Sequence, residues 1–130
     1  MLKILYVLVL SILSTSAFAY VKCENVEVTA VQSAAGASFH SFHELGIQGS
    51  TVFVSIPPSI CSDSEGEAMA ATVYLVLSDY DNAGPWKKML SSMLLTAKAS
   101  GKQVSVHATN RGVNSRGFQV IDPYYMVIKD

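Results

Sequence analysis

The chain has 130 residues, and its nine Lys and Arg residues against ten Asp and Glu residues give a formal net charge of −1 at pH 7. This balance excludes the strongly basic surfaces that bind nucleic acids and anionic membranes. A chain of this length is expected to form one domain.

The amino terminus has the three parts of a secretory signal peptide. Met1-Leu2-Lys3 supplies a positive start, residues 4–13 are apolar, and Ala17-Phe18-Ala19 is a cleavage site with small residues. The pattern predicts cleavage after Ala19, which leaves 20–130 as a single mature domain with a net charge of −2. An uncleaved membrane anchor is the alternative, but it requires about 20 apolar residues. We therefore expect a secreted or periplasmic protein with no membrane span in the mature chain.

Both cysteines, Cys23 and Cys61, lie in the mature part. Because an exported chain meets an oxidising compartment, a single disulfide between them is predicted, with two free thiols as the alternative.

The first half of the mature chain has the pattern of strands. Strands are expected at Val21–Val31, within Phe39–Ile47, at Ser50–Ile56 and at Thr72–Leu77, with a turn at 33–38 and a loop at 59–67. The run 68–77 is almost uniformly apolar. Its alanine-rich start could form a helix, but 72–77 is more typical of a strand, and the continuous apolar run indicates a strand that is covered on both faces.

One amphipathic helix is expected at Pro85–Ser100. Its apolar residues recur three and four positions apart and should pack on a core; they are Trp86, Met89, Leu90, Met93, Leu94 and Ala97. Pro85 suits the first helical position and Gly101 the left-handed residue that ends a helix. Trp86 could instead stack on a sugar ring, but its place in the stripe favours a core anchor. The other face should meet water or a neighbouring copy of the chain, and its candidate contact residues are Lys88, Ser91, Ser92 and Leu95.

Two strands should follow the helix. The first is expected at Gln103–Thr109, and the second at Phe118–Ile128, broken or bent at Asp122-Pro123. The order along the chain is then β-β-β-β-α-β-β. This order predicts a mainly β fold, a small and partly open barrel with one long helix, of the oligomer-binding (OB) type.

No catalytic or metal-binding motif accompanies these elements. His40 and His43 with Glu44 resemble a metal cluster, but positions i and i+3 of a strand point to opposite faces and no further Cys/His group completes a zinc site. Ser38, His43 and Asp63 could be written as a hydrolytic triad, but no Gly-x-Ser-x-Gly motif is present. Asp79 and Asp81, just before the helix, are typical capping and turn residues. We therefore expect no enzyme activity, no cofactor and no metal.

Tyr124 and Tyr125 are the candidate ligand-binding residues. They are adjacent on the last expected strand and should point to opposite faces, so one of them is expected to be exposed. A phenol with nearby Asn and Arg groups offers binding chemistry.

The segment from Trp86 to His107 resembles the B subunits of bacterial toxins in which five copies form a ring, in particular the subtilase-cytotoxin and pertussis-like B subunits. The residues that carry the resemblance are Leu90-x-x-x-Leu94-x-x-Ala97-x-x-Ser100-Gly101-Lys102-x-Val104-x-Val106. The resemblance implies an OB fold, a homopentamer whose helices line a central pore, host-cell glycans as ligands, and an enzymatic A subunit as partner. The cysteine placement differs, and no stretch matches the sialic-acid pocket of these relatives. A monomeric or dimeric periplasmic binding or inhibitor module, with a similar barrel and no toxin partner, is the alternative.

Overall fold

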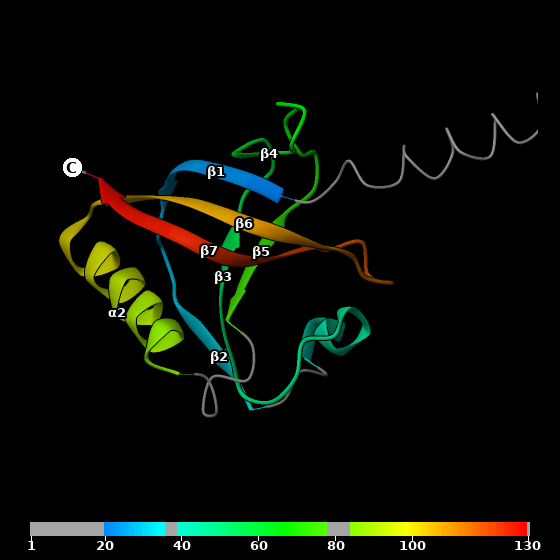
Figure 1. The fold of residues 1–130 in the computed structure, drawn as a ribbon, viewed down its shortest axis with the longest axis horizontal. Coiled ribbons are helices and arrows are strands. Elements are labelled where there is room, and N and C mark those ends of the chain that lie inside the picture. Colours follow the sequence, from blue (N-terminus) through cyan, green and yellow to red (C-terminus); the bar gives the residue numbers. More distant parts are fainter. Residues whose placement is uncertain (1–19, 36–38, 78–83, 130) are drawn as a thin grey trace, which may run out of the picture.

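A computed structural model of the protein describes residues 20–35, 39–77 and 84–129 (Figure 1). In chain order the elements are β1 (Tyr20–Glu27), β2 (Gln32–Ala34), the 3₁₀ helix η1 (Phe39–Leu45), β3 (Thr51–Ile56), β4 (Cys61–Ser62), β5 (Val73–Leu77), α2 (Pro85–Ser100), β6 (Gln103–Val113) and β7 (Gln119–Lys129). The fold is mainly β with one long helix, as the sequence predicts. The expected signal peptide, the turn residues 36–38 and the capping residues Asp79 and Asp81 lie outside the described residues.

The strands form one mixed seven-stranded sheet in the order β2-β3-β5-β7-β6-β1-β4. The β5–β7 pair is parallel and the other pairs are antiparallel. The hydrogen-bonded order of the described strands is open, so the sheet does not close into the predicted barrel.

The sheet is nevertheless curled. Only residues 28–31 connect β1 to β2, although four other strands separate these two in the sheet. The connection spans at most about 17 Å. Five strand spacings in a flat sheet would take about 24 Å. The sheet must therefore bend until β1 approaches the β2–β3 edge.

The central strands bury both of their faces, as the apolar run at 72–77 predicts. Alternate residues of β5 enter two separate core clusters: Val73 and Leu75 pack towards α2, whereas Val76 packs with Phe42 and Phe53 beneath η1. The sheet thus has a helix on one side and the η1 segment on the other (Figure 1).

Helix α2 has the predicted ends, with Pro85 in its first turn and Gly101 left-handed at φ 69°. Its buried residues are Leu90, Ser91, Leu94 and Ala97. Trp86 and Met89 are 48% and 58% exposed, so the prediction that they pack on the core is wrong. At 100° per residue they lie about 80° and 140° from Leu94, beyond the width of the face that meets the sheet.

The strand expected within Phe39–Ile47 is also wrong, because this segment forms η1. Within η1, His40 and Ser41 both adopt left-handed φ angles, 53° and 58°. η1 is therefore not one continuous 3₁₀ helix but has a kink at these two residues, and it is not an extended strand.

The remaining differences concern the edges and the last hairpin. The short edge strands β2 and β4 lie in segments expected to be a turn and a loop. Strand β6 continues beyond the expected end at Thr109. β7 stays one strand through Pro123, and the expected irregularity is a register shift next to Pro123 rather than a break.

Cys23 and Cys61 form the predicted disulfide. They face each other in the β1–β4 pair, so the bond joins the amino-terminal strand to the loop after β3. In the parts of the chain that the structure describes, no helix is long and apolar enough to cross a membrane.

Candidate functional site

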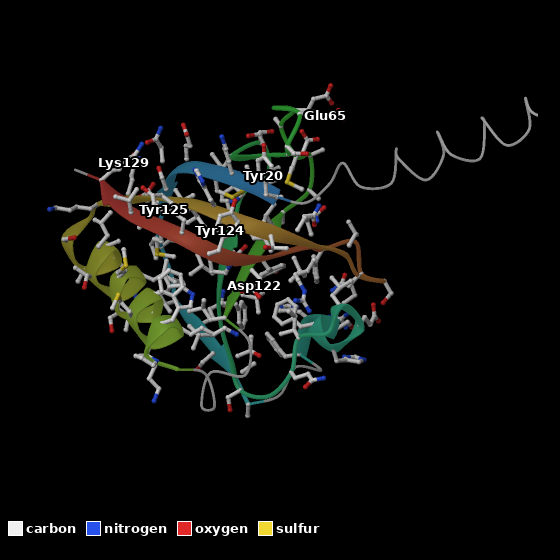
Figure 2. All side chains as sticks on the ribbon, viewed as in Figure 1. Tyr20, Glu65, Asp122, Tyr124, Tyr125 and Lys129 are labelled. Carbon is white, nitrogen blue, oxygen red and sulfur yellow. A yellow bond between two sulfur atoms is a disulfide. The ribbon has the colours of Figure 1, made fainter. Side chains whose placement is uncertain are left out.

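Tyr124 and Tyr125 both lie at the surface, because a β-bulge interrupts β7 at this point. In the β6–β7 pair His107 is opposite Tyr125 but Ala108 is opposite Pro123, which leaves Tyr124 without a residue across from it. An extra residue of this kind removes the strict alternation of a strand. Each tyrosine is 49% exposed, whereas Pro123 and Met126 on either side are buried. Figure 2 labels the two tyrosines on β7. The opposite-facing arrangement of the two tyrosines predicted one exposed ring, and the bulge exposes both.

His107 completes a small aromatic surface with the two tyrosines. Its ring centroid lies 5.0 Å from that of Tyr125 and 6.4 Å from that of Tyr124. Lys22 of β1 is the neighbour of His107 on its other side. We name Tyr124, Tyr125 and His107 the tyrosine patch.

The patch offers flat apolar rings with polar edges. Within the described residues, neither tyrosine hydroxyl has a protein hydrogen-bond partner, so both can donate to or accept from a ligand. Tyrosine provides a large contact area at a low cost in side-chain entropy. This combination suits ligands that carry both C–H faces and hydroxyl groups.

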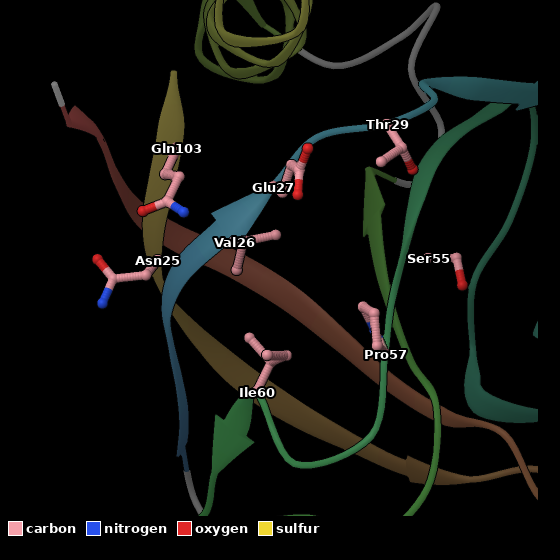
Figure 3. Close-up of a pocket in the computed structure, with 8 residues that line it drawn as sticks. All are labelled: Asn25, Val26, Glu27, Thr29, Ser55, Pro57, Ile60 and Gln103. Carbon is pink, nitrogen blue, oxygen red and sulfur yellow. The ribbon is translucent and has the colours of Figure 1, made fainter. Parts of the chain in front are cut away.

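A groove lies where β1 leaves β6 and turns towards β2. It has a volume of about 360 Å³ and is lined by residues of β1, β3, β6 and the turn after β3 (Figure 3): Asn25, Val26, Glu27, Thr29, Ser55, Pro57, Ile60 and Gln103. The sequence analysis singled out none of these residues. The groove exists only because the curled sheet brings the end of β1 to the end of β3.

His40, one of the two histidines considered and rejected as metal ligands, lies among aromatic rings. The His40 ring stacks on Tyr74, with centroids 5.2 Å apart, and meets Phe118 edge-on. Burial among these rings lowers the pKa of His40, and the charge of Arg116 lowers it further. Both effects favour the neutral form of the imidazole.

Glu44 holds the hairpin between β6 and β7. Its two carboxylate oxygens accept hydrogen bonds from the N–H and the hydroxyl of Ser115, at 2.7 and 2.6 Å. These bonds lower the pKa of Glu44. Arg111 and Asn114 of the hairpin donate to the carbonyls of Leu45 and His40, so η1 is fixed to the hairpin by three side chains. We interpret His40 and Glu44 as structural residues, whereas His43 is exposed.

The candidate interface residues of α2 divide between two sides. Lys88, Ser92 and Leu95 are exposed, with Leu95 at 53%. Ser91 is buried against the subunit's own core and cannot meet a neighbouring helix. Trp86 and Met89 join the exposed residues, so the outer side of α2 is more apolar than the sequence predicts.

No protein-family model matches this chain, and no curated protein matches its sequence.

Sequence reasoning missed His107 as a site residue, although the alternation of β6 placed it on the outer face. The register that brings it beside Tyr125 depends on strand pairing, which no local pattern encodes. The signal available in the sequence was Pro123, because a proline in a strand marks a possible bulge.

Proposed function

We propose that the chain is a secreted, non-enzymatic recognition subunit that binds cell-surface glycans and assembles into a homo-oligomeric ring. The proposal of glycan binding rests on the bulge at Tyr124, which places two consecutive tyrosines at the surface beside His107. Exposed large aromatic residues in a cluster are typical of binding surfaces.

The strand arrangement supports an OB-like assignment of the fold. β1 and β2 can be taken as one bent strand, which then pairs with β3 at one end and with β6 at the other. Between them the strand order is β3-β5-β7-β6, the β5–β7 pair is parallel, and the helix lies between β5 and β6 along the chain. This is the arrangement of a five-stranded, partly open Greek-key barrel, a fold that often binds oligosaccharides.

The exposed residues of α2 support the proposal that the chain assembles into a ring. Trp86, Met89 and Leu95 are large apolar residues on one 16-residue helix, and each is about half exposed. At 100° per residue Leu95 lies about 180° from Trp86, so the two helices that flank α2 in a closed ring would cover Trp86 and Met89 on one side and Leu95 on the other. By the resemblance to toxin B subunits, an enzymatic A subunit is the partner expected on the ring.

Removing Tyr125 is expected to weaken glycan binding at least about tenfold, since truncation of a central aromatic anchor commonly costs more than 1 kcal/mol. The measurement is binding of the mature protein to a broad glycan array, followed by titration of the best ligand against Tyr125→Ala. Val113→Ala is the control, because Val113 is 56% exposed but lies at the hairpin end of β6. Equal losses in both variants would contradict the role of the patch.

Ser92→Glu is expected to shift the ring towards monomers while leaving each monomer folded, because a closed ring brings the new like charges together. Light scattering of the purified mature protein measures the assembly, and thermal unfolding checks the monomer. Gln48→Glu adds the same charge at an exposed position away from α2 and should leave the ring intact. A wild-type protein that is monomeric at tens of micromolar and binds no glycan would favour the periplasmic-module alternative.

A further inference from the structure

The geometry points to a second ligand site in the groove between β1 and the turn after β3, which we propose takes an uncharged sugar ring and excludes anionic sugars. The inference extends the proposed function to a second surface. It does not depend on the tyrosine patch, because the lining residues of the two sites are different.

The groove has the size of a small-molecule site. Its volume of about 360 Å³ lies near the lower end of the range for ligand pockets, about 300 to 1,000 Å³. The lining residues come from three separate segments of the chain, 25–29, 55–60 and 103, and Figure 3 shows Val26, Pro57 and Ile60 around the space between β1 and the turn after β3. A single sugar ring fits this scale better than a long chain of sugars.

Strand β1 has an irregular backbone where it borders the groove. A register shift between Cys23 and Val26 marks a bulge, and within it Asn25 adopts a left-handed φ of 57°. The Asn25 N–H lies 3.4 Å from the Ser105 hydroxyl, its hydrogen-bond acceptor on β6. Non-glycine residues in this conformation concentrate at functional sites, where the surrounding structure holds them.

The polar groups of the groove are available to a ligand. Five of the lining residues carry an amide, a carboxylate or a hydroxyl: Asn25, Gln103, Glu27, Thr29 and Ser55. The Asn25 amide points away from Ile60 and Pro57 (Figure 3). In the described part of the chain none of these side chains makes a hydrogen bond to another protein group. Sugar hydroxyls can pair with all three kinds of group, and a hydroxyl that donates to Glu27 forms a charge-assisted bond.

The apolar part of the lining suits the C–H face of a sugar. Val26 is almost fully buried at the groove, and Ile60 is 40% exposed beside Pro57. A ligand that covered Ile60 would remove this side chain from water, which favours binding.

The charge of the groove selects among sugars. Glu27 is its one charged lining residue, and Lys, Arg and His are absent from the eight residues. A sugar carboxylate would lie close to the Glu27 carboxylate without a cation to offset the repulsion. The groove therefore differs in specificity from a site for sialic acid.

The place of the groove on the sheet connects it to the patch. Gln103 and His107 point to the same face of β6 and are four residues apart, which is about 13 Å along a strand. One oligosaccharide could contact both sites.

The test follows backbone amide signals of the labelled mature protein by NMR during titration with free monosaccharides. Glucose, galactose and N-acetylglucosamine are the neutral probes, and glucuronic acid is the anionic probe. We expect at least one neutral sugar to shift the amides of residues 25–29, 55–60 and 103, and glucuronic acid to bind at least tenfold more weakly than glucose. No shift there with any neutral sugar, or equal binding of glucuronic acid, would overturn the proposal.

Glu27→Gln provides the decisive variant. It should weaken the neutral sugar about tenfold and reduce the discrimination against glucuronic acid, because both effects depend on the carboxylate. Glu24→Gln makes the same change at an exposed position of β1 outside the lining and should alter neither. Identical behaviour of the two variants would also overturn the site. Tyr125→Ala should leave the groove shifts unchanged, so failure of the tyrosine patch and failure of the groove are separate results.

Discussion

Leu94→Ala is expected to lower the free energy of unfolding by about 2–5 kcal/mol, the range observed for large-to-small changes in cores. Leu94 is 1% exposed at the centre of the buried face of α2, in the same core cluster as Leu75 and Val106. Its truncation removes apolar contacts and leaves a cavity between the helix and the sheet, which close-packed neighbours fill only in part.

The measurement is urea unfolding followed by circular dichroism. Leu95→Ala is a matched control, because Leu95 is the next residue of the same helix and is 53% exposed. It should change the free energy of unfolding of the isolated subunit by about 0.5 kcal/mol or less. A loss for Leu94→Ala as small as that of its neighbour would show that α2 does not pack on the sheet through this face.

Cys61→Ser is expected to cost about 2–4 kcal/mol of stability. The disulfide to Cys23 closes a loop with a sequence separation of 38 residues. In the chain-entropy description, a loop of this length restricts the unfolded state by about 4 kcal/mol at 25 °C. Both sulfurs are buried, so the new serine hydroxyl also has to enter an apolar site.

Two comparisons separate the bond from the new hydroxyl. Reduction of the wild type should lower its stability towards that of the variant. The double variant Cys23→Ser, Cys61→Ser should lose far less than two single losses added together, because the first substitution already breaks the bond. Strict additivity would mean that the two cysteines stabilise the fold independently of each other.

Some features of this protein depend on short stretches of sequence and could be predicted from them. The run at 72–77 is apolar at consecutive positions, and only a strand covered on both faces buries every one of them. Helix α2 begins and ends where Pro85 and Gly101 place it, because each fixes its own backbone conformation. The disulfide could be predicted because the mature part of an exported chain contains two cysteines, which an oxidising compartment is expected to join.

Features that depend on pairing between distant segments could not be predicted. The apolar residues of α2 cover a wider part of the helix surface than the sheet can bury. Which of them are buried depends on the contact of α2 with β6 and β7, which buries Ser91 and leaves Trp86 and Met89 exposed. The segment 39–45 has too few residues for its period to be assigned. Its 3₁₀ conformation is fixed by hydrogen bonds to a hairpin more than 60 residues away.

The candidate sites show the same division. The sequence by itself determined that Tyr124 and Tyr125 lie on a strand near the surface, and that an acidic residue and two amide residues occur at positions 27, 25 and 103. Only the tertiary structure decided that a bulge opposite His107 exposes both tyrosines, and that the curl of the sheet gathers Glu27, Asn25 and Gln103 with Ser55 around one groove. The physical reason is that strand register and sheet curvature result from the packing of the whole sheet, whereas propensity and periodicity act over a few residues.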